Sequence, residues 1–219
     1  MIFVNFKTFK EGTGHGALEL VKVLEEVAHL SRVKIIPVVQ STDIKEIVLS
    51  SKLEVWAQKI DPVSYGAHTG SILPEAVFED GAVGTFLNHS EAKLATFAEL
   101  KQTNQKAKEV GLKTLIFTAG ISELNRILAL KPTFVAYEPP ELVGSRETSV
   151  AQAKPEIISE ASVLAKNAGI PLIVGAGIHS QEDVKKSLEL GAVGVVVASD
   201  IVLAEDPKKE LLDLVEGFR

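Results

Sequence analysis

The chain has 219 residues, of which 46% are hydrophobic and 24% are charged, and 29 acidic residues against 23 basic ones give a formal net charge of -6. A folded chain of this length buries roughly 70–75% of the surface that it exposes when unfolded, which is enough for a substantial core. The acidic balance argues against nucleic acid as a partner, because proteins that bind nucleic acid carry a basic excess on their surface. The absence of cysteine excludes disulfides, thiolate metal sites and cysteine nucleophiles.

No apolar run approaches the roughly 20 residues that are needed to cross a bilayer. The first ten residues, MIFVNFKTFK, lack the small-residue cleavage pattern of a secretory signal. We therefore expect a soluble, cytoplasmic protein with no membrane partner.

Short runs of β-branched and apolar residues recur along the chain, and stretches with helical spacing separate them. The runs are apolar throughout rather than alternating, which is typical of a parallel sheet with helices on its faces. Strands are expected at Ile2–Phe6, Val33–Val39, Glu54–Gln58, Ala82–Phe86, Thr114–Phe117, Thr133–Tyr137, Leu172–Val174 and Val193–Val197.

Two helices are indicated by apolar stripes at helical spacing, one between Ala17 and Ala28 and one between Ile157 and Ala168. The second helix is ended by Gly169 and Pro171. Further helices are expected at Thr42–Leu49, Leu73–Phe78, Glu91–Val110, Ser122–Leu130, Glu182–Leu190 and Pro207–Val215.

Eight strand–helix units in 219 residues leave about 27 residues per unit, which suits a short (β/α)8 barrel. No linker or compositional break divides the chain, so a single barrel domain over residues 1–219 is expected. A doubly wound open sheet is the structural alternative. That fold ordinarily has a glycine-rich first turn, and this chain has Asn5-Phe6-Lys7 there instead.

In a barrel the active site lies at the carboxyl ends of the strands. Glu138 directly follows the sixth expected strand, where a carboxylate shielded from water is a competent general base. His89 follows the fourth strand and precedes an expected helix, whose positive end favours a neutral imidazole that can donate to a substrate carbonyl. Taken singly, Glu138 fits an ordinary glutamate at a strand end better than a base, and His89 fits a capping residue equally well.

Lys7 is expected to place a positive charge at the mouth of the site. An anionic substrate needs such a local charge in a protein of net charge -6. Asn5, two residues earlier, is expected on the same side of the strand, where it can orient the lysine or the substrate. The alternative for Lys7 is a solvated lysine at an exposed edge.

The glycine-bearing loops after strands six, seven and eight suggest a phosphate cradle, because their backbone N–H groups can converge on an anion. The candidate donors are Gly144, Gly177, Ala198 and Ser199. The segment Glu141–Val150 has the length of a mobile lid, although an ordinary surface loop accounts for it equally well. His15, His29, His68 and His179 are scattered and are assigned no role, and no metal site or cofactor is expected.

The motifs Asn5-Phe6-Lys7, Asn88-His89-Ser90-Glu91 and Tyr137-Glu138-Pro139, in this order and spacing, resemble those of the triosephosphate isomerases. The resemblance extends from the first strand to the last helix and is closest to the short archaeal-type branch. It includes Gly175-Ala176-Gly177-Ile178 and Ala198-Ser199, which are similar to the archaeal phosphate loops.

The resemblance implies that dihydroxyacetone phosphate and D-glyceraldehyde 3-phosphate are interconverted through an enediolate, without a cofactor. It makes Glu138 the base, His89 the electrophile, and Asn5 and Lys7 substrate-binding residues. Backbone contacts to the phosphate are implied for Val143, Gly144, Gly177, Ala198 and Ser199. The loop around Thr69 resembles the family's third loop, which enters a neighbouring subunit and implies a homo-oligomer, either dimer or tetramer.

Two other functions are considered beside this one. A Schiff-base aldolase needs a lysine that projects from a middle or late strand, and no lysine falls within the expected strands four to eight. A non-catalytic phosphate-binding barrel would be expected to lack Glu138, His89 or Lys7, and all three are present.

Overall fold

The computed structural model describes residues 1–139, 153 and 155–219 and contains a closed barrel of strands in the order β1 to β8. All neighbouring strands are parallel, and β1 pairs with β8, with Ile2 opposite Val195, so that no sheet edge is left open. The (β/α)8 barrel predicted from the sequence is therefore confirmed. The strands are β1 (Ile2–Asn5), β2 (Ile35–Val39), β3 (Trp56–Ala57), β4 (Gly84–Leu87), β5 (Lys113–Thr118), β6 (Phe134–Tyr137), β7 (Leu172–Val174) and β8 (Gly194–Val197).

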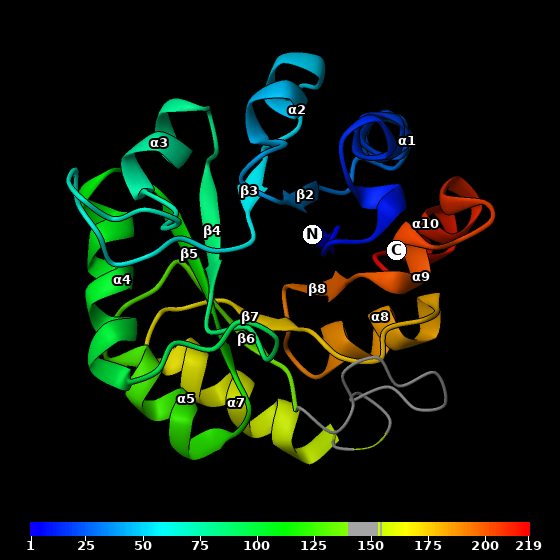
Figure 1. Ribbon diagram of the computed structural model, residues 1–219. Helices are drawn as coiled ribbons and strands as arrows, with labels where there is room; N and C mark the ends of the chain where they lie inside the picture. Colours follow the sequence, from blue (N-terminus) through cyan, green and yellow to red (C-terminus); the bar gives the residue numbers. More distant parts are fainter. Residues whose placement is uncertain (140–152, 154) are drawn as a thin grey trace.

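The helices form an outer ring around the strands (Figure 1). They follow the strands in sequence, as right-handed crossover connections between parallel strands require. The helices of the described residues are η1 (Lys10–Gly12), α1 (His15–Ser31), α2 (Ile44–Ser50), α3 (Pro74–Glu79), α4 (Phe97–Glu109), α5 (Ile121–Leu128), α7 (Pro155–Asn167), α8 (Gln181–Glu189), α9 (Ser199–Val202) and α10 (Pro207–Glu216).

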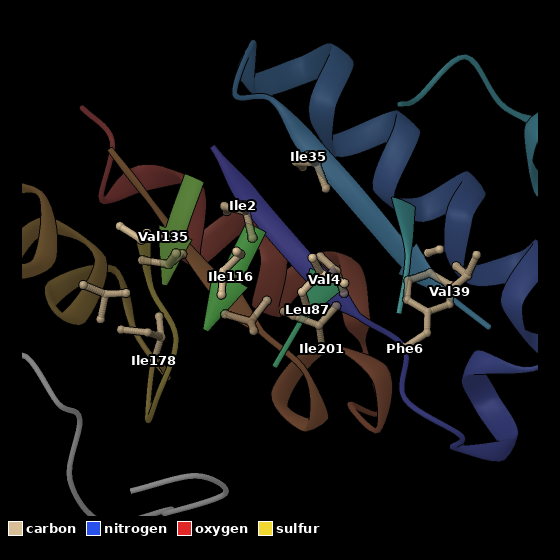
Figure 2. Close-up of a cluster of buried hydrophobic side chains, with 14 of the residues drawn as sticks. Ile2, Val4, Phe6, Ile35, Val39, Leu87, Ile116, Val135, Ile178 and Ile201 are labelled. Atoms are coloured by element: carbon tan, nitrogen blue, oxygen red, sulfur yellow. The ribbon is translucent and has the colours of Figure 1, made fainter. Parts of the chain in front are cut away.

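Two hydrophobic clusters hold the barrel together. The smaller one fills the barrel interior, where the Trp56 indole meets the Phe3 ring edge-on at a centroid distance of 5.1 Å. The larger one lies between the strands and the helix ring, and Figure 2 shows part of it around Ile2, Val4 and Ile116. Strands that are buried on both faces explain why the sequence shows apolar runs instead of alternation.

The helix expected at Glu91–Val110 is wrong at its start, because α4 begins only at Phe97. The Thr96 side chain accepts a hydrogen bond from the Glu99 N–H, and Glu99 accepts one from the Ala95 N–H. These bonds satisfy backbone donors at the helix terminus and set its start, as an N-cap does. Residues 90–96 therefore form turns and bends between β4 and α4.

Two other differences concern the site. A short helix, α9, begins at Ser199 directly after β8, where the sequence predicted only a loop. Strand β5 begins at Lys113, so one lysine does lie within strands four to eight, contrary to the sequence prediction. The expected lid Glu141–Val150, with Val143 and Gly144, lies outside the described residues.

Candidate active site

A cavity opens at the carboxyl ends of β1, β4, β6, β7 and β8. This is the end of the barrel where enzymes of this fold carry their active sites. The candidate residues that line it are Asn5, Lys7, His89, Glu138, Gly177, Ala198 and Ser199. Every candidate within the described residues thus reaches the same cavity, although these residues span most of the chain.

Glu138 stands directly after β6, and its side chain is only 4% exposed. Its backbone N–H donates to the Thr118 carbonyl at 2.9 Å, which continues the β5–β6 pairing and fixes the direction of the side chain. The Ser90 hydroxyl donates to Glu138 Oε2 at 3.0 Å, and His89 Nε2 lies 3.5 Å from the same oxygen. A largely dehydrated carboxylate with one hydroxyl partner is well placed to accept a proton.

His89 is buried, with 6% of its surface exposed. The backbone N–H of Glu91 donates to His89 Nδ1 at 3.2 Å, so Nδ1 acts as an acceptor and carries no proton. The neutral ring then holds its proton on Nε2, the nitrogen that faces Glu138. The sequence argument reached a neutral imidazole through a helix N-terminus, and that reason is wrong because α4 begins eight residues later.

Lys7 lies beyond the end of β1, in a left-handed conformation with φ 49°. The expected strand geometry for Asn5 and Lys7 is therefore wrong, since the chain has already turned at Lys7. Asn5 Oδ1 instead accepts the Lys7 backbone N–H at 3.1 Å, which stabilises that turn. The Lys7 ammonium lies 2.7 Å from Glu91 Oε1, so its charge is held beside His89.

The loop that carries His89 and Ser90 begins with Asn88, which has φ 60°. The Asn88 amide donates to the Phe117 carbonyl at 3.0 Å and to Glu123 Oε1 at 3.1 Å. Glu123 also accepts the Ala119 N–H at 2.8 Å. These bonds fasten the β4 loop to the end of β5 and so orient the histidine.

The loops after β7 and β8 also border the cavity. Gly177 has φ 62°, a left-handed conformation that glycine adopts without a steric cost. Ala198 is the residue before α9, and Ser199 is the first residue of that helix. Their backbone groups therefore lie at the turn where β8 ends.

Two residues that the sequence analysis did not assign to the site also line the cavity, namely His179 and Asp200. His179 Nδ1 lies 3.0 Å from Asp200 Oδ1, and the side chains are 26% and 39% exposed. Their positions two residues after Gly177 and directly after Ser199 are the signal that could have found them. His179, which the sequence analysis grouped with three scattered histidines, therefore lies at the site.

The fold and the cavity together define a (β/α)8-barrel enzyme whose carboxylate and imidazole face one small site. The family model described as "Triosephosphate isomerase" matches residues 1–217. A triosephosphate isomerase of Methanobacterium bryantii is 44% identical over 217 residues, covering 98% of this chain and 95% of that protein. The triosephosphate isomerase of Methanothermus fervidus is 42% identical, and the match covers 98% of this chain and 97% of that protein. The one of Methanocaldococcus jannaschii is 37% identical, and the match covers 99% of each chain. The chain belongs to the triosephosphate isomerase family.

Within the described part of the chain, no helix is both long enough and apolar enough to cross a membrane. The same residues contain no group of three or more histidine, aspartate or glutamate side chains that could hold a metal ion.

Proposed function

We propose that this protein is an isomerase that interconverts dihydroxyacetone phosphate and D-glyceraldehyde 3-phosphate, a step of glycolysis and gluconeogenesis. The observation that carries the proposal is the approach of His89 Nε2 to within 3.5 Å of Glu138 Oε2, in a cavity that Lys7 also lines. The membership of the chain in the family, over residues 1–217, supports the same reaction.

Glu138 acts as the base. It removes a proton from the carbon that bears the hydroxyl of dihydroxyacetone phosphate, and the electron pair of that C–H bond forms the C=C bond of an enediolate. The protonated carboxyl then returns the proton to the former carbonyl carbon, which leaves an aldehyde. Burial of Glu138 keeps water away from the abstracted proton during this transfer.

His89 acts as the electrophile through the proton on Nε2. A neutral imidazole donates a hydrogen bond to the oxygen that becomes negative in the enediolate, and it can pass a proton between the two enediolate oxygens. The Lys7 ammonium adds a fixed positive charge near the same oxygens. Preorganised donors of this kind typically contribute about 3–4 kcal/mol each to lowering a barrier.

Substrate binding at the phosphate end is assigned to backbone N–H groups of Gly177, Ala198 and Ser199, together with Val143 and Gly144. The first three border the cavity, which supports their role. Asn5 contributes by holding the turn that presents Lys7, through its 3.1 Å bond to the Lys7 N–H.

Strand β5 contains a lysine, Lys113, but this lysine does not support the aldolase alternative. Lys113 is the first residue of β5, so it lies at the opposite end of the barrel from the cavity. Its ammonium lies 3.3 Å from Glu54 Oε2 and is paired there. Among the described residues that line the cavity, the sole lysine is Lys7, which lies outside every strand.

The proposal is tested by incubating dihydroxyacetone phosphate with the protein in D₂O. NMR then follows two signals, the deuterium that enters the hydroxyl-bearing carbon of the substrate and the aldehyde of the product. We expect turnover by the wild type and a loss of about 10²–10⁴-fold in Glu138→Gln. Glu160→Gln, which changes an exposed glutamate of α7, is the matched control and should retain wild-type turnover. Wild-type turnover in Glu138→Gln would refute the role of the base.

A homo-oligomer formed through the loop around Thr69 is part of the same proposal, as is a cytoplasmic location. Residues 64–71 are exposed in the monomer, and Tyr65 is 69% exposed, which supports a role of this loop in subunit contact. Light scattering is expected to show a dimer or tetramer for the wild type and a smaller species for Thr69→Arg. A wild-type monomer at micromolar concentration would contradict this part of the proposal.

A further inference from the structure

Among the described residues, the lining of the cavity carries little positive charge for the anion that is proposed to bind there. Its lining contains one ammonium, Lys7, against two carboxylates, Glu138 and Asp200. Glu91, 2.7 Å from Lys7, offsets that ammonium further. With both imidazoles neutral, the described lining therefore has a negative balance, whereas a triose phosphate arrives as an anion of nearly two charges.

Two histidines of the lining could supply the missing charge, and the structure separates them. His89 Nδ1 accepts the Glu91 N–H, so protonation of that nitrogen would place two N–H groups against each other. His179 is placed differently, because its Nδ1 lies 3.0 Å from Asp200 Oδ1, so that a proton on Nδ1 faces a carboxylate. Protonation of His179 adds its proton to Nε2, a buried atom with no hydrogen-bond partner among the described residues.

Other charged groups around His179 are mostly acidic. On α8, Asp183 Oδ2 accepts the His179 backbone N–H at 3.1 Å, and Glu182 stands in the first turn. On α10, Asp213 accepts the Gln181 N–H at 3.0 Å. Lys7, Glu138 and His89 line the same cavity. Lys7 is the described cation that shares the cavity with His179.

Asp200 explains why that cation matters for a phosphate. It directly follows Ser199, one of the proposed phosphate donors, and it lines the same cavity. Charges within about 8 Å interact across physiological salt, and more strongly when they are partly buried. A bare carboxylate at this position would repel the dianion, whereas a carboxylate paired with an imidazolium has no net charge.

We propose that His179 is a substrate-positioning residue that takes up a proton when the phosphate dianion binds. In the complex, the His179–Asp200 pair then has no net charge, in the cavity that the proposed phosphate donors also line. The inference rests on the proposed function for the identity of the anion. It makes His179 the group through which affinity for that anion depends on pH.

The experiment measures binding of inorganic sulfate by calorimetry between pH 5.5 and 8.5, in two buffers of different ionisation enthalpy. Sulfate stays a dianion over this range, so any proton taken up comes to the protein. Histidine changes charge between about pH 5 and 8. We expect the wild type to bind sulfate about five- to tenfold more tightly at pH 6 than at pH 8, with net proton uptake near neutral pH.

The matched variants separate charge from structure. His179→Gln keeps a donor for Asp200 but cannot become a cation, so it should bind sulfate weakly and almost independently of pH. Asp200→Asn removes the repelling carboxylate, so it should bind more tightly than the wild type at pH 8. The double variant should recover the binding that His179→Gln loses. His29→Gln, at an exposed position of α1, is the control and should keep the wild-type profile.

Turnover gives a second measurement. At pH 6.5, His179→Gln should raise KM for dihydroxyacetone phosphate about fivefold while kcat falls by about twofold at most, since the residue acts on binding. The inference is overturned if wild-type sulfate binding is absent or independent of pH, or if His179→Gln keeps the wild-type profile. If His179→Gln does not fold, failure of Asp200→Asn to tighten binding at pH 8 overturns it.

The sulfate measurement needs no turnover, so the two proposals fail separately. A protein that binds sulfate with the expected pH dependence but exchanges no deuterium retains this inference and loses the proposed function. A protein that isomerises its substrate but binds sulfate equally at every pH retains the function and loses this inference.

Discussion

Two non-glycine residues at the site adopt left-handed backbone conformations, Lys7 with φ 49° and Asn88 with φ 60°. Each follows the end of a strand, β1 or β4, and each turn is held by an asparagine side chain. A left-handed conformation costs an L-residue about 1–2 kcal/mol, although asparagine tolerates it better than most. The site thus concentrates backbone strain where the ammonium and the imidazole must be aimed.

This strain predicts an order of stability for Asn88 variants. Asn88→Gly loses the amide hydrogen bonds but relieves the backbone, whereas Asn88→Ala loses the bonds and keeps the strain. Chemical denaturation should therefore find Asn88→Ala less stable than Asn88→Gly by about 1 kcal/mol. Equal stability of the two variants would show that the left-handed turn is not strained.

His89 predicts a measurable tautomer. Because the Glu91 N–H donates to Nδ1, nitrogen-15 NMR at neutral pH should find the proton of the His89 ring on Nε2. Replacing this donor in His89→Ala should lower kcat about 10²–10³-fold, the usual effect of losing one preorganised donor. A ring found protonated on Nδ1 would remove the reason for the proposed electrophile.

At the scale of elements, β3 and β4 depend on the fit between a glycine and a tryptophan. A Cβ atom at Gly84 would lie 2.6 Å from Trp56 Cε2, closer than real side chains approach. The indole is fully buried and packs against Phe3, Phe86 and Phe134, so it has little room to move.

We therefore expect Gly84→Ala to lower the free energy of unfolding by about 1–3 kcal/mol. Trp56→Phe has a smaller ring and also removes an indole N–H that has no partner among the described residues. In the double variant, the loss should be smaller than the sum of the two single losses, as a double-mutant cycle would measure. Strict additivity would contradict the predicted clash.

A charge cluster joins the amino ends of the strands, on the side of the barrel away from the site. Glu54 precedes β3 and accepts from Lys34, next to β2, at 2.5 Å and from Lys113 of β5 at 3.3 Å. Burial alone would raise the pKa of the Glu54 carboxyl, but the hydrogen bonds and charges of the two lysines lower it below its ordinary value. Residues at this end of a barrel serve stability.

The lowered pKa predicts how stability changes with pH. The stabilisation is present above the ordinary pKa of a glutamate and is lost as pH falls through the lowered pKa of the folded state. Between about pH 5 and 3, the wild type should therefore lose more stability than Glu54→Gln. Denaturation at several pH values measures this difference, and Glu160→Gln should follow the wild type.

At the scale of the whole molecule, closure of the barrel joins the first strand to the last. β1 pairs with β8, and a Cβ atom at Gly194 would lie 2.2 Å from the Met1 carbonyl oxygen. The single tryptophan, Trp56, lies inside the barrel. Its fluorescence therefore reports whether the barrel interior is intact.

We expect one cooperative unfolding transition, in which tryptophan fluorescence and far-ultraviolet circular dichroism coincide. Gly194→Ala places a side chain against backbone that cannot rotate away, so it should lower Tm by both probes together. Two separated transitions would show that the barrel unfolds in parts.

The relation between sequence and structure differs from residue to residue. The strands were predictable because apolar runs mark a sheet that is buried on both faces, and β7 has the predicted bounds. The early start expected for α4 was wrong because residues 91–95 have helix-forming side chains, whereas the cap at Thr96 decides where the helix begins. The short helix α9 has no periodic pattern of its own and was missed.

The sequence by itself determined the alternation of strands and helices, and it placed Glu138, His89 and Lys7 after strands, because apolar periodicity and strand ends are local properties. Only the tertiary structure decided which nitrogen of His89 carries a proton, that Lys7 meets Glu91, and that His179 joins Asp200 at the cavity. These contacts join separate loops at the barrel rim, and their distances depend on closure of the sheet, which no short stretch of sequence encodes.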